Sequence, residues 1–139
     1  MRIAVIDGQG GGIGKRIVES LRANLPEDIE IIALATNALA ASQMLKAGAN
    51  EGASGENAVV YNASKVDIIV GTVALLVPNS MLGEMTAKMV EAIGCSNAIK
   101  VLIPLNRSNI YIVGAVDEPL PHQIDALVDK LKELISKRG

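Results

Sequence analysis

Aromatic side chains are almost absent from this sequence. Its 139 residues include two tyrosines, Tyr61 and Tyr111, but neither phenylalanine nor tryptophan. Proteins that bind single-stranded nucleic acids stack bases on aromatic side chains, so this class of function is disfavoured. The net charge of −2 and the lack of a basic cluster also disfavour duplex DNA and RNA, which proteins bind through lysines and arginines.

Cysteines and long apolar runs are scarce too. Cys95 is the only cysteine, which excludes an internal disulfide and makes a reducing cytoplasm the expected compartment. The longest apolar stretch, residues 68–77, is about half as long as a membrane span requires. An apolar strand starts at residue 2, so we expect no signal peptide. The sequence has no cluster of histidine, cysteine and carboxylate residues with metal-ligand spacing, and we expect no metal site.

The order of apolar and amphipathic segments predicts the secondary structure. Continuous β-forming runs indicate buried parallel strands, and apolar residues three or four positions apart indicate helices. Strands are expected at 2–6, 29–35, 66–72 and 98–105, with a short one within 48–55 and an optional extension of the fourth to 77. Helices are expected at 13–21, 37–47, 55–63 and 82–93, and after Pro119. A hairpin turn at 106–109 would lead into a short antiparallel strand at 110–113.

This alternation predicts a single doubly wound, Rossmann-like α/β domain over residues 1–139. We expect about five parallel strands in the order 3-2-1-4-5, with the short antiparallel strand added near the C-terminus. Four loops would then meet at the carboxyl edge of the sheet, where ligands bind in such folds. These loops are residues 8–14, 36–37, 78–80 and 106–107.

A glycine-rich turn follows the first strand directly. Gly8, Gly12 and Gly14 have the spacing G-x-x-x-G-x-G, which resembles the loop of short-chain dehydrogenases and other NAD(P)-binding Rossmann proteins. The pattern G-x-G-x-x-G fails at Ile13, and the P-loop pattern fails at Gln9 and at Arg16. Such a turn presents N–H groups at the positive end of a helix and favours an anion. The alternative is that the glycines serve only close packing of helix on strand. The predicted nucleotide-binding residues of this turn are Asp7, Gly8, Gln9, Gly10, Gly11, Gly12, Ile13 and Gly14.

The end of the second strand bears on the choice of cofactor. NAD-binding domains place an acidic residue there to hold the ribose hydroxyls, but this chain has Thr36 and Asn37, which we predict to contact the ligand. The missing carboxylate weakens the case for NAD. It leaves room for NADP, with Lys15 or Arg16 near the 2′-phosphate, or for another phosphate-bearing ligand. The alternative, which we favour, is that both cations belong to a solvated first helical turn.

Other polar residues carry weaker predictions. Asn79 and Ser80 are predicted to line the ligand crevice, with turn formation as the alternative for both. The carboxylate of Asp7 would repel an anion unless it orients a ribose, an amide or a cation. Arg107 at the hairpin tip and His122 at a helix start are interpreted as surface residues.

Tyr61 and Lys65 match the Y-x-x-x-K pair of short-chain dehydrogenases. In that family the pair lies farther downstream, on a long helix after the fifth strand. Here it precedes the fourth strand, and the chain is too short for that family's substrate-binding part. We therefore interpret the match as a coincidence.

Six stretches carry a resemblance that covers nearly the whole chain. They are Ile3–Lys15, Ala35–Ala40, Lys46–Ala58, Pro78–Glu84, Ile103–Arg107 and Asp117–His122. In these stretches the chain resembles a family of short bacterial proteins catalogued as a domain of unknown function. The resemblance implies a Rossmann-like fold and carries over no activity.

Three functional hypotheses are compatible with these features. The leading one is a small cytoplasmic nucleotide-binding protein, with NAD or NADP as the cofactor and no assigned reaction. The second is a ligand-sensing or partner-binding module without chemistry. The third is a small enzyme whose site is completed by a second subunit, since the Met- and Leu-rich stretch 73–90 predicts a homo-oligomer.

Overall fold

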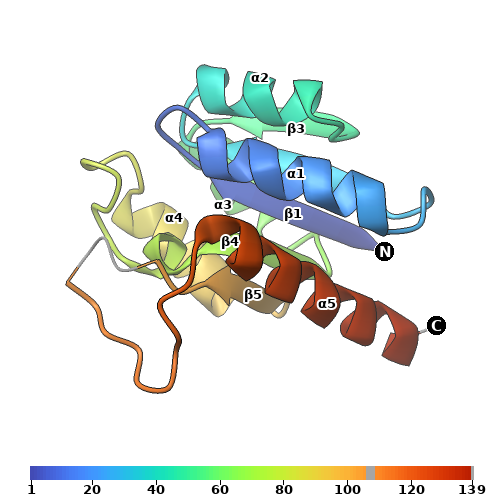
Figure 1. Cartoon of the computed structure of the whole chain (residues 1–139). Helices are drawn as coiled ribbons and strands as arrows, with labels where there is room; N and C mark the ends of the chain where they lie inside the picture. The colour runs from blue at the N-terminus through green and yellow to red at the C-terminus, as the bar shows by residue number, and fades with distance from the viewer. Residues whose placement is uncertain (106–108, 139) are drawn as a thin grey trace.

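The computed structural model describes residues 1–105 and 109–138. One five-stranded sheet runs through the domain in the order β3-β2-β1-β4-β5, and every neighbouring pair is parallel, which confirms the predicted topology (Figure 1). The strands are β1 (Arg2–Asp7), β2 (Glu30–Ala35), β3 (Glu51–Ser54), β4 (Ile68–Thr72) and β5 (Ile99–Ile103).

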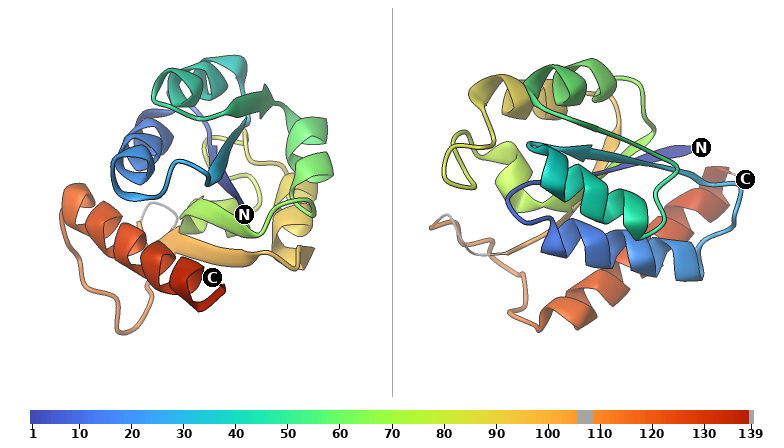
Figure 2. Two further views of the ribbon diagram at one scale, coloured as in Figure 1. Left: turned by 90° about the vertical axis from the view of Figure 1, so that its right-hand side faces the viewer. Right: turned by 90° about the horizontal axis from the view of Figure 1, so that it is seen from above.

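Helices cover both faces of this sheet, as Figure 2 shows. On one face lie α1 (Gly12–Asn24), α2 (Ala38–Lys46) and α5 (Leu120–Arg138), and on the other lie α3 (Glu56–Asn62) and α4 (Ala87–Cys95). Side chains alternate between the two cores along β1, since Ile3 and Val5 join the α1–α5 side while Ala4 and Ile6 join the α3–α4 side. Burial on both faces explains why the strand sequence is apolar without interruption.

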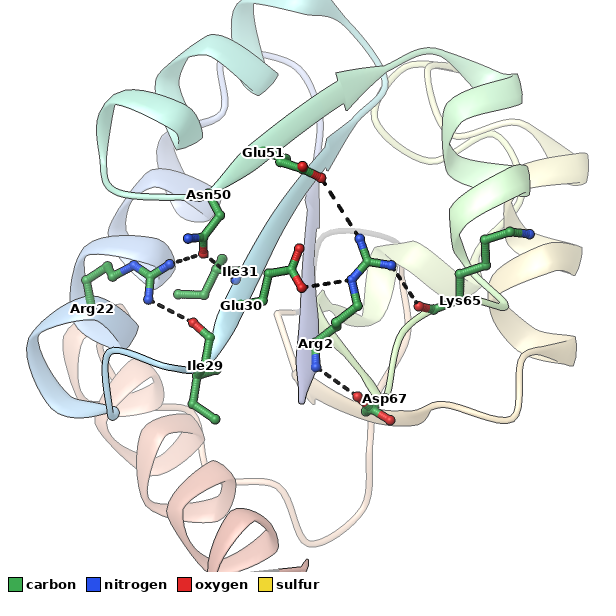
Figure 3. Close-up of polar contacts among 9 residues, drawn as sticks. All are labelled: Arg2, Arg22, Ile29, Glu30, Ile31, Asn50, Glu51, Lys65 and Asp67. Carbon is green, nitrogen blue, oxygen red and sulfur yellow. Dashed lines mark hydrogen bonds and ion pairs between the residues drawn. The ribbon is translucent and has the colours of Figure 1, made fainter.

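Two arginines, Arg2 and Arg22, form polar contacts that link neighbouring elements at the amino edge of the sheet (Figure 3). The guanidinium of Arg2 pairs with Glu30 at 3.2 Å, and its backbone N–H donates to Asp67 Oδ2 at 2.8 Å. Arg22 Nη1 donates to the carbonyl of Ile29 at 2.9 Å. Asp67 also pairs with Arg138 at 3.1 Å, so both ends of the described chain are fastened at this edge. The opposite, carboxyl edge is where the sequence predicts the binding loops.

The predicted antiparallel strand at 110–113 is wrong. Residues 109–119 contain neither helix nor strand, and Tyr111 and Val113 are 83% and 100% exposed. The run has the residue types of a strand, but Tyr111, Ile112 and Val113 stay exposed in the described structure, and burial is what stabilises such side chains. Most of the predicted hairpin turn, including Asn106 and Arg107, lies outside the described residues.

The predicted helix at 82–93 is correct only in its second half. Met81, Leu82 and Gly83 have φ values of 58°, 56° and 91°, which a right-handed helix cannot contain. Helix α4 starts instead after Thr86, whose Oγ1 accepts a hydrogen bond from the N–H of Met89 at 3.2 Å and caps the helix. The optional extension of the fourth strand is a short 3-10 helix, η1 (Val73–Leu76).

The last helix is confirmed, and its apolar stripe packs on the sheet through Ile124, Leu127, Val128 and Leu131. Within residues 1–105 and 109–138, no helix combines the length and apolar character needed to cross a membrane.

Candidate functional site

The glycine-rich turn joins β1 to α1 at the carboxyl edge of the sheet. It is closed by a 2.9 Å hydrogen bond from the N–H of Gly11 to the carbonyl of Gly8. Gly11, the residue before α1, has a φ of 74°, and a Cβ there would lie 2.7 Å from Ala40 Cα in α2. Gly11 is therefore required by the fold, both for its left-handed conformation and for the close approach of α1 and α2.

Gly10 and Gly12 differ from Gly11. Neither has a φ in the left-handed region, and a Cβ at either position would have no atom within 4 Å in the described structure. Gly12 and Ile13 open α1, so no carbonyl of that helix accepts from their N–H groups. The packing of the domain therefore gives no reason for glycine at these two positions.

Asp7 ends β1 and is 8% exposed. Its Oδ2 accepts a hydrogen bond of 2.7 Å from the N–H of Gly14, in the first turn of α1. A carboxylate at this point is stabilised by the positive end of the helix dipole. Asp7 thus takes one of the N–H groups that the sequence predicts for the ligand.

A cavity of about 250 Å³ opens beside the turn, between the carboxyl ends of β1 and β4. In the strand order 3-2-1-4-5 this is the point where successive strands change direction across the sheet, and ligands of open α/β folds bind in this crevice. Its described lining consists of Asp7, Gln9, Ile13, Thr72, Ala74, Met81, Leu82 and Leu105.

The segment between η1 and α4, residues 77–86, lies against the glycine-rich turn, with Met81 beside Gly8. We call it the covering segment. Asn79, Met81 and Leu82 have φ values of 64°, 58° and 56°, a conformation that non-glycine residues adopt at a cost. The hydroxyl of Ser80 donates to the carbonyl of Ala74 at 2.7 Å and shapes this segment. Ser80 is 9% exposed, and the side chains that reach the cavity are those of Met81 and Leu82 rather than Asn79 and Ser80.

Glu84, near the end of the covering segment, is a site residue that the sequence did not reveal. Its Oε1 accepts hydrogen bonds from Thr36 Oγ1 at 2.6 Å, from the N–H of Gln9 at 2.8 Å and from Asn37 Nδ2 at 2.8 Å. These bonds, with that of Thr36 contributing most, lower the pKa of Glu84 below its usual value. A carboxylate thus lies at the end of β2 after all. It comes from 48 residues farther along the chain, so no local pattern points to it.

Thr36 and Asn37 therefore lie against the glycine-rich turn, both through Glu84 and directly. Asn37 links the two loops further, because its Nδ2 donates to the carbonyl of Gln9 at 2.9 Å while its Oδ1 caps α2 at Ala40. A Cβ at Gly8 would collide with Thr36 Oγ1 and lie 2.7 Å from Met81 Sδ. The turn, the end of β2 and the covering segment form one compact unit.

Several other candidate residues lie away from this unit. The Lys65 ammonium lies 4.0 Å from the centre of the Tyr61 ring, and the Lys65 carbonyl accepts from Arg2 at the amino edge (Figure 3), so the dehydrogenase-like pair is remote from the turn. Lys15 is exposed and pairs with Glu19 at 4.0 Å. Arg16, His122 and Cys95 are exposed on α1, α5 and α4 respectively. Within the described ranges, no group of three or more His, Cys, Asp or Glu residues could hold a metal ion.

Comparisons with known proteins place the chain in a family. No curated protein matches it. A dodecameric FMN-dependent Ubix-like decarboxylase from Escherichia coli O157:H7 aligns with 95% of this chain and 94% of its own, at 12% sequence identity and a TM-score of 0.47. The family match covers residues 2–136, nearly the whole sequence. The chain belongs to the family described as domain of unknown function (DUF3842).

Proposed function

We propose that this protein binds a nucleotide, with NAD(P) as the leading candidate, across the glycine-rich turn. The observation that carries the proposal is glycine at positions 10 and 12, where a Cβ would meet nothing within 4 Å. Gly12 lies in α1, where glycine is less favourable than alanine by up to about 1 kcal/mol, and Gly10 lies in the turn before it. Packing gives neither position a reason for glycine, so another reason is needed. Close approach of a diphosphate to the backbone is such a reason.

The position of the cavity supports the same proposal. It lies at the switch point of the sheet, and the turn that borders it opens α1, which runs for 13 residues. At about 250 Å³ it is slightly smaller than the range of about 300–1,000 Å³ that is typical of ligand pockets. A dinucleotide would therefore place only one of its halves in the cavity and extend the other across the turn, toward Thr36.

The lining of the cavity favours binding over catalysis by one subunit alone. Asp7 is the only ionisable side chain among its described lining residues, and its carboxylate is already engaged with α1. General acid–base chemistry needs a titratable group within hydrogen-bond reach of the reacting atom. We therefore assign no reaction, and the ligand-sensing alternative gains support from the same observation.

Homo-oligomerisation stays a prediction. Within the apolar stretch 73–90, Leu75, Met85 and Met89 are buried in this subunit, whereas Leu82 is 96% exposed at the mouth of the cavity. An interface through Leu82 would place a second copy next to the bound nucleotide.

A thermal-shift screen with NAD, NADP, ATP, coenzyme A and S-adenosylmethionine tests the proposal. A ligand at about 100 times its Kd adds about 2.7 kcal/mol to the stability of the folded state, which raises Tm by several degrees. We expect a shift with NAD or NADP. The absence of a shift with all five compounds, in protein shown by mass spectrometry to carry no retained ligand, would refute the proposal.

A further inference from the structure

Three hydrogen-bond donors converge on one point at the end of β2. They are the N–H of Gln9, the hydroxyl of Thr36 and the amide of Asn37, all within 2.8 Å of Glu84 Oε1. They come from two loops of the predicted ligand site, and all three are neutral. Their convergence on a carboxylate shows that this point is built to stabilise a negative charge.

The anion that fills this point belongs to the chain itself. Glu84 reaches it from the segment that passes over the glycine-rich turn, where Met81 lies beside Gly8. A phosphate group and the carboxylate of Glu84 cannot share the same three donors, since two anions in contact repel each other. A ligand phosphate can therefore enter only if Glu84 leaves.

The covering segment contains backbone strain that a displacement of Glu84 could release. Asn79, Met81 and Leu82 all have left-handed backbone conformations, which are unfavourable for non-glycine residues and persist only while surrounding contacts hold them. The three bonds to Glu84 Oε1 are such contacts. The Ser80 hydroxyl bond to Ala74 and the 2.7 Å bond from the N–H of Asn79 to the carbonyl of Met85 also hold the segment, so displacement of Glu84 would have to shift Met81 from Gly8 against these contacts.

We propose that Glu84 is an internal substitute for a ligand phosphate, held on a three-donor anion subsite formed by Gln9, Thr36 and Asn37, and that a nucleotide with a phosphate at this point binds only when Glu84 is displaced. This inference rests on the proposed function and extends it in two ways. It makes the covering segment a lid over the glycine-rich turn. It also assigns the subsite at the end of β2 to a phosphate, which favours a nucleotide phosphorylated on its ribose, NADP, over NAD.

Substitution of Glu84 tests the inference through affinity. A competing closed state lowers the apparent affinity by the fraction of molecules that are open, so removing the carboxylate raises it. For Glu84→Ala we expect a Kd for NADP at least about tenfold lower than in the wild type, with a smaller change for NAD. Glu84→Gln keeps the size of the side chain but not its charge, and should give an intermediate gain. Glu91→Ala, on the exposed side of α4, removes the same charge outside the site and should leave both Kd values unchanged.

Isothermal titration calorimetry of the full chain with NADP and NAD gives five distinguishable outcomes. A graded gain for NADP supports the inference. Equal Kd values in the wild type and both Glu84 variants overturn the lid but leave the proposed function intact. An equal gain for NAD and NADP overturns the assignment of the subsite to a phosphate. Weaker binding in Glu84→Ala also overturns it, and would make Glu84 an acceptor for ribose hydroxyls. No binding of NAD or NADP to any variant overturns this inference and the assignment of NAD(P), whereas the proposed function as a whole is refuted only if the five-compound screen also shows no shift. If Glu84→Ala does not fold, the Glu84→Gln variant decides among the same outcomes.

Discussion

Gly11→Ala provides the sharpest test of the local structure, because two independent effects should lower the stability of this variant. An alanine at a φ of 74° is less stable than glycine by about 1–2 kcal/mol. Its Cβ would also lie 2.7 Å from Ala40 Cα, a backbone atom of α2 that cannot rotate away, and overpacking of this kind costs about 1–3 kcal/mol. We expect a total loss of about 2–5 kcal/mol in the free energy of unfolding.

The neighbouring glycines serve as matched controls for this prediction. Gly10→Ala should change the free energy of unfolding by less than about 0.5 kcal/mol, because its Cβ enters open space. Gly12→Ala should be neutral or stabilising by up to about 1 kcal/mol, because alanine favours the helix. Urea unfolding followed by circular dichroism measures all three values. Equal stability of Gly11→Ala and Gly10→Ala would refute the reasoning, since the left-handed φ and the close approach of α1 to α2 both occur at Gly11 and neither occurs at Gly10.

Three further predictions concern charge and packing. Thr36→Val should raise the pKa of Glu84 toward its usual value, because it removes the bond that lowers this pKa most; NMR titration of the carboxyl carbon measures the change. The N–H of Arg2, more than any other group, lowers the pKa of Asp67, so the stabilisation by Asp67 is present above the unfolded pKa of about 3.9 and is lost as the pH falls through the lower folded value. Asp67→Asn should therefore lower stability by about 1 kcal/mol or less at pH 7, and this difference should vanish in urea melts near pH 2. Leu131→Ala removes a fully buried side chain of α5 and should lower the free energy of unfolding by about 2–5 kcal/mol, whereas a loss below 1 kcal/mol would contradict the packing of α5 on the sheet.

The sheet could be predicted from the sequence because its signals are local. The apolar runs that form β1, β2 and β4 need only their own residues to be recognised, and the alternation with helices determines the parallel topology. The glycine-rich turn was equally visible, since glycines between a strand and a helix are a pattern of adjacent residues. The stability of the core and the position of the site both follow from these elements.

The errors arose where tertiary contacts outweigh local preference. Residues 110–113 have strand-forming side chains, but the domain offers no layer to bury them. Met85, Met89 and Ile93 fit a helical period and are all buried, yet α4 starts only after Thr86. Gly83 and Thr86 could have revealed this start as a helix breaker and a cap.

Glu84 could not have been found in this way. Its three partners come from two other loops, and Thr36 lies 48 positions away in the sequence. No acidic residue directly follows the second strand in the sequence. Glu84, from a distant segment, nevertheless places a carboxylate at that point. If the proposed function is correct, the choice between NAD and NADP would depend on whether Glu84 stays or leaves.

The central claim is that the glycine-rich turn binds a nucleotide, and one comparison tests it most directly. Calorimetric titration of NAD and NADP into the wild type and into Gly12→Ala separates binding from folding, because a Cβ at Gly12 disturbs no protein atom. We predict that the wild type binds at least one of the two nucleotides, and that Gly12→Ala weakens this binding by at least about tenfold while its Tm stays equal or rises. Equal affinity of the two proteins, or no binding by the wild type at millimolar nucleotide, would contradict the account.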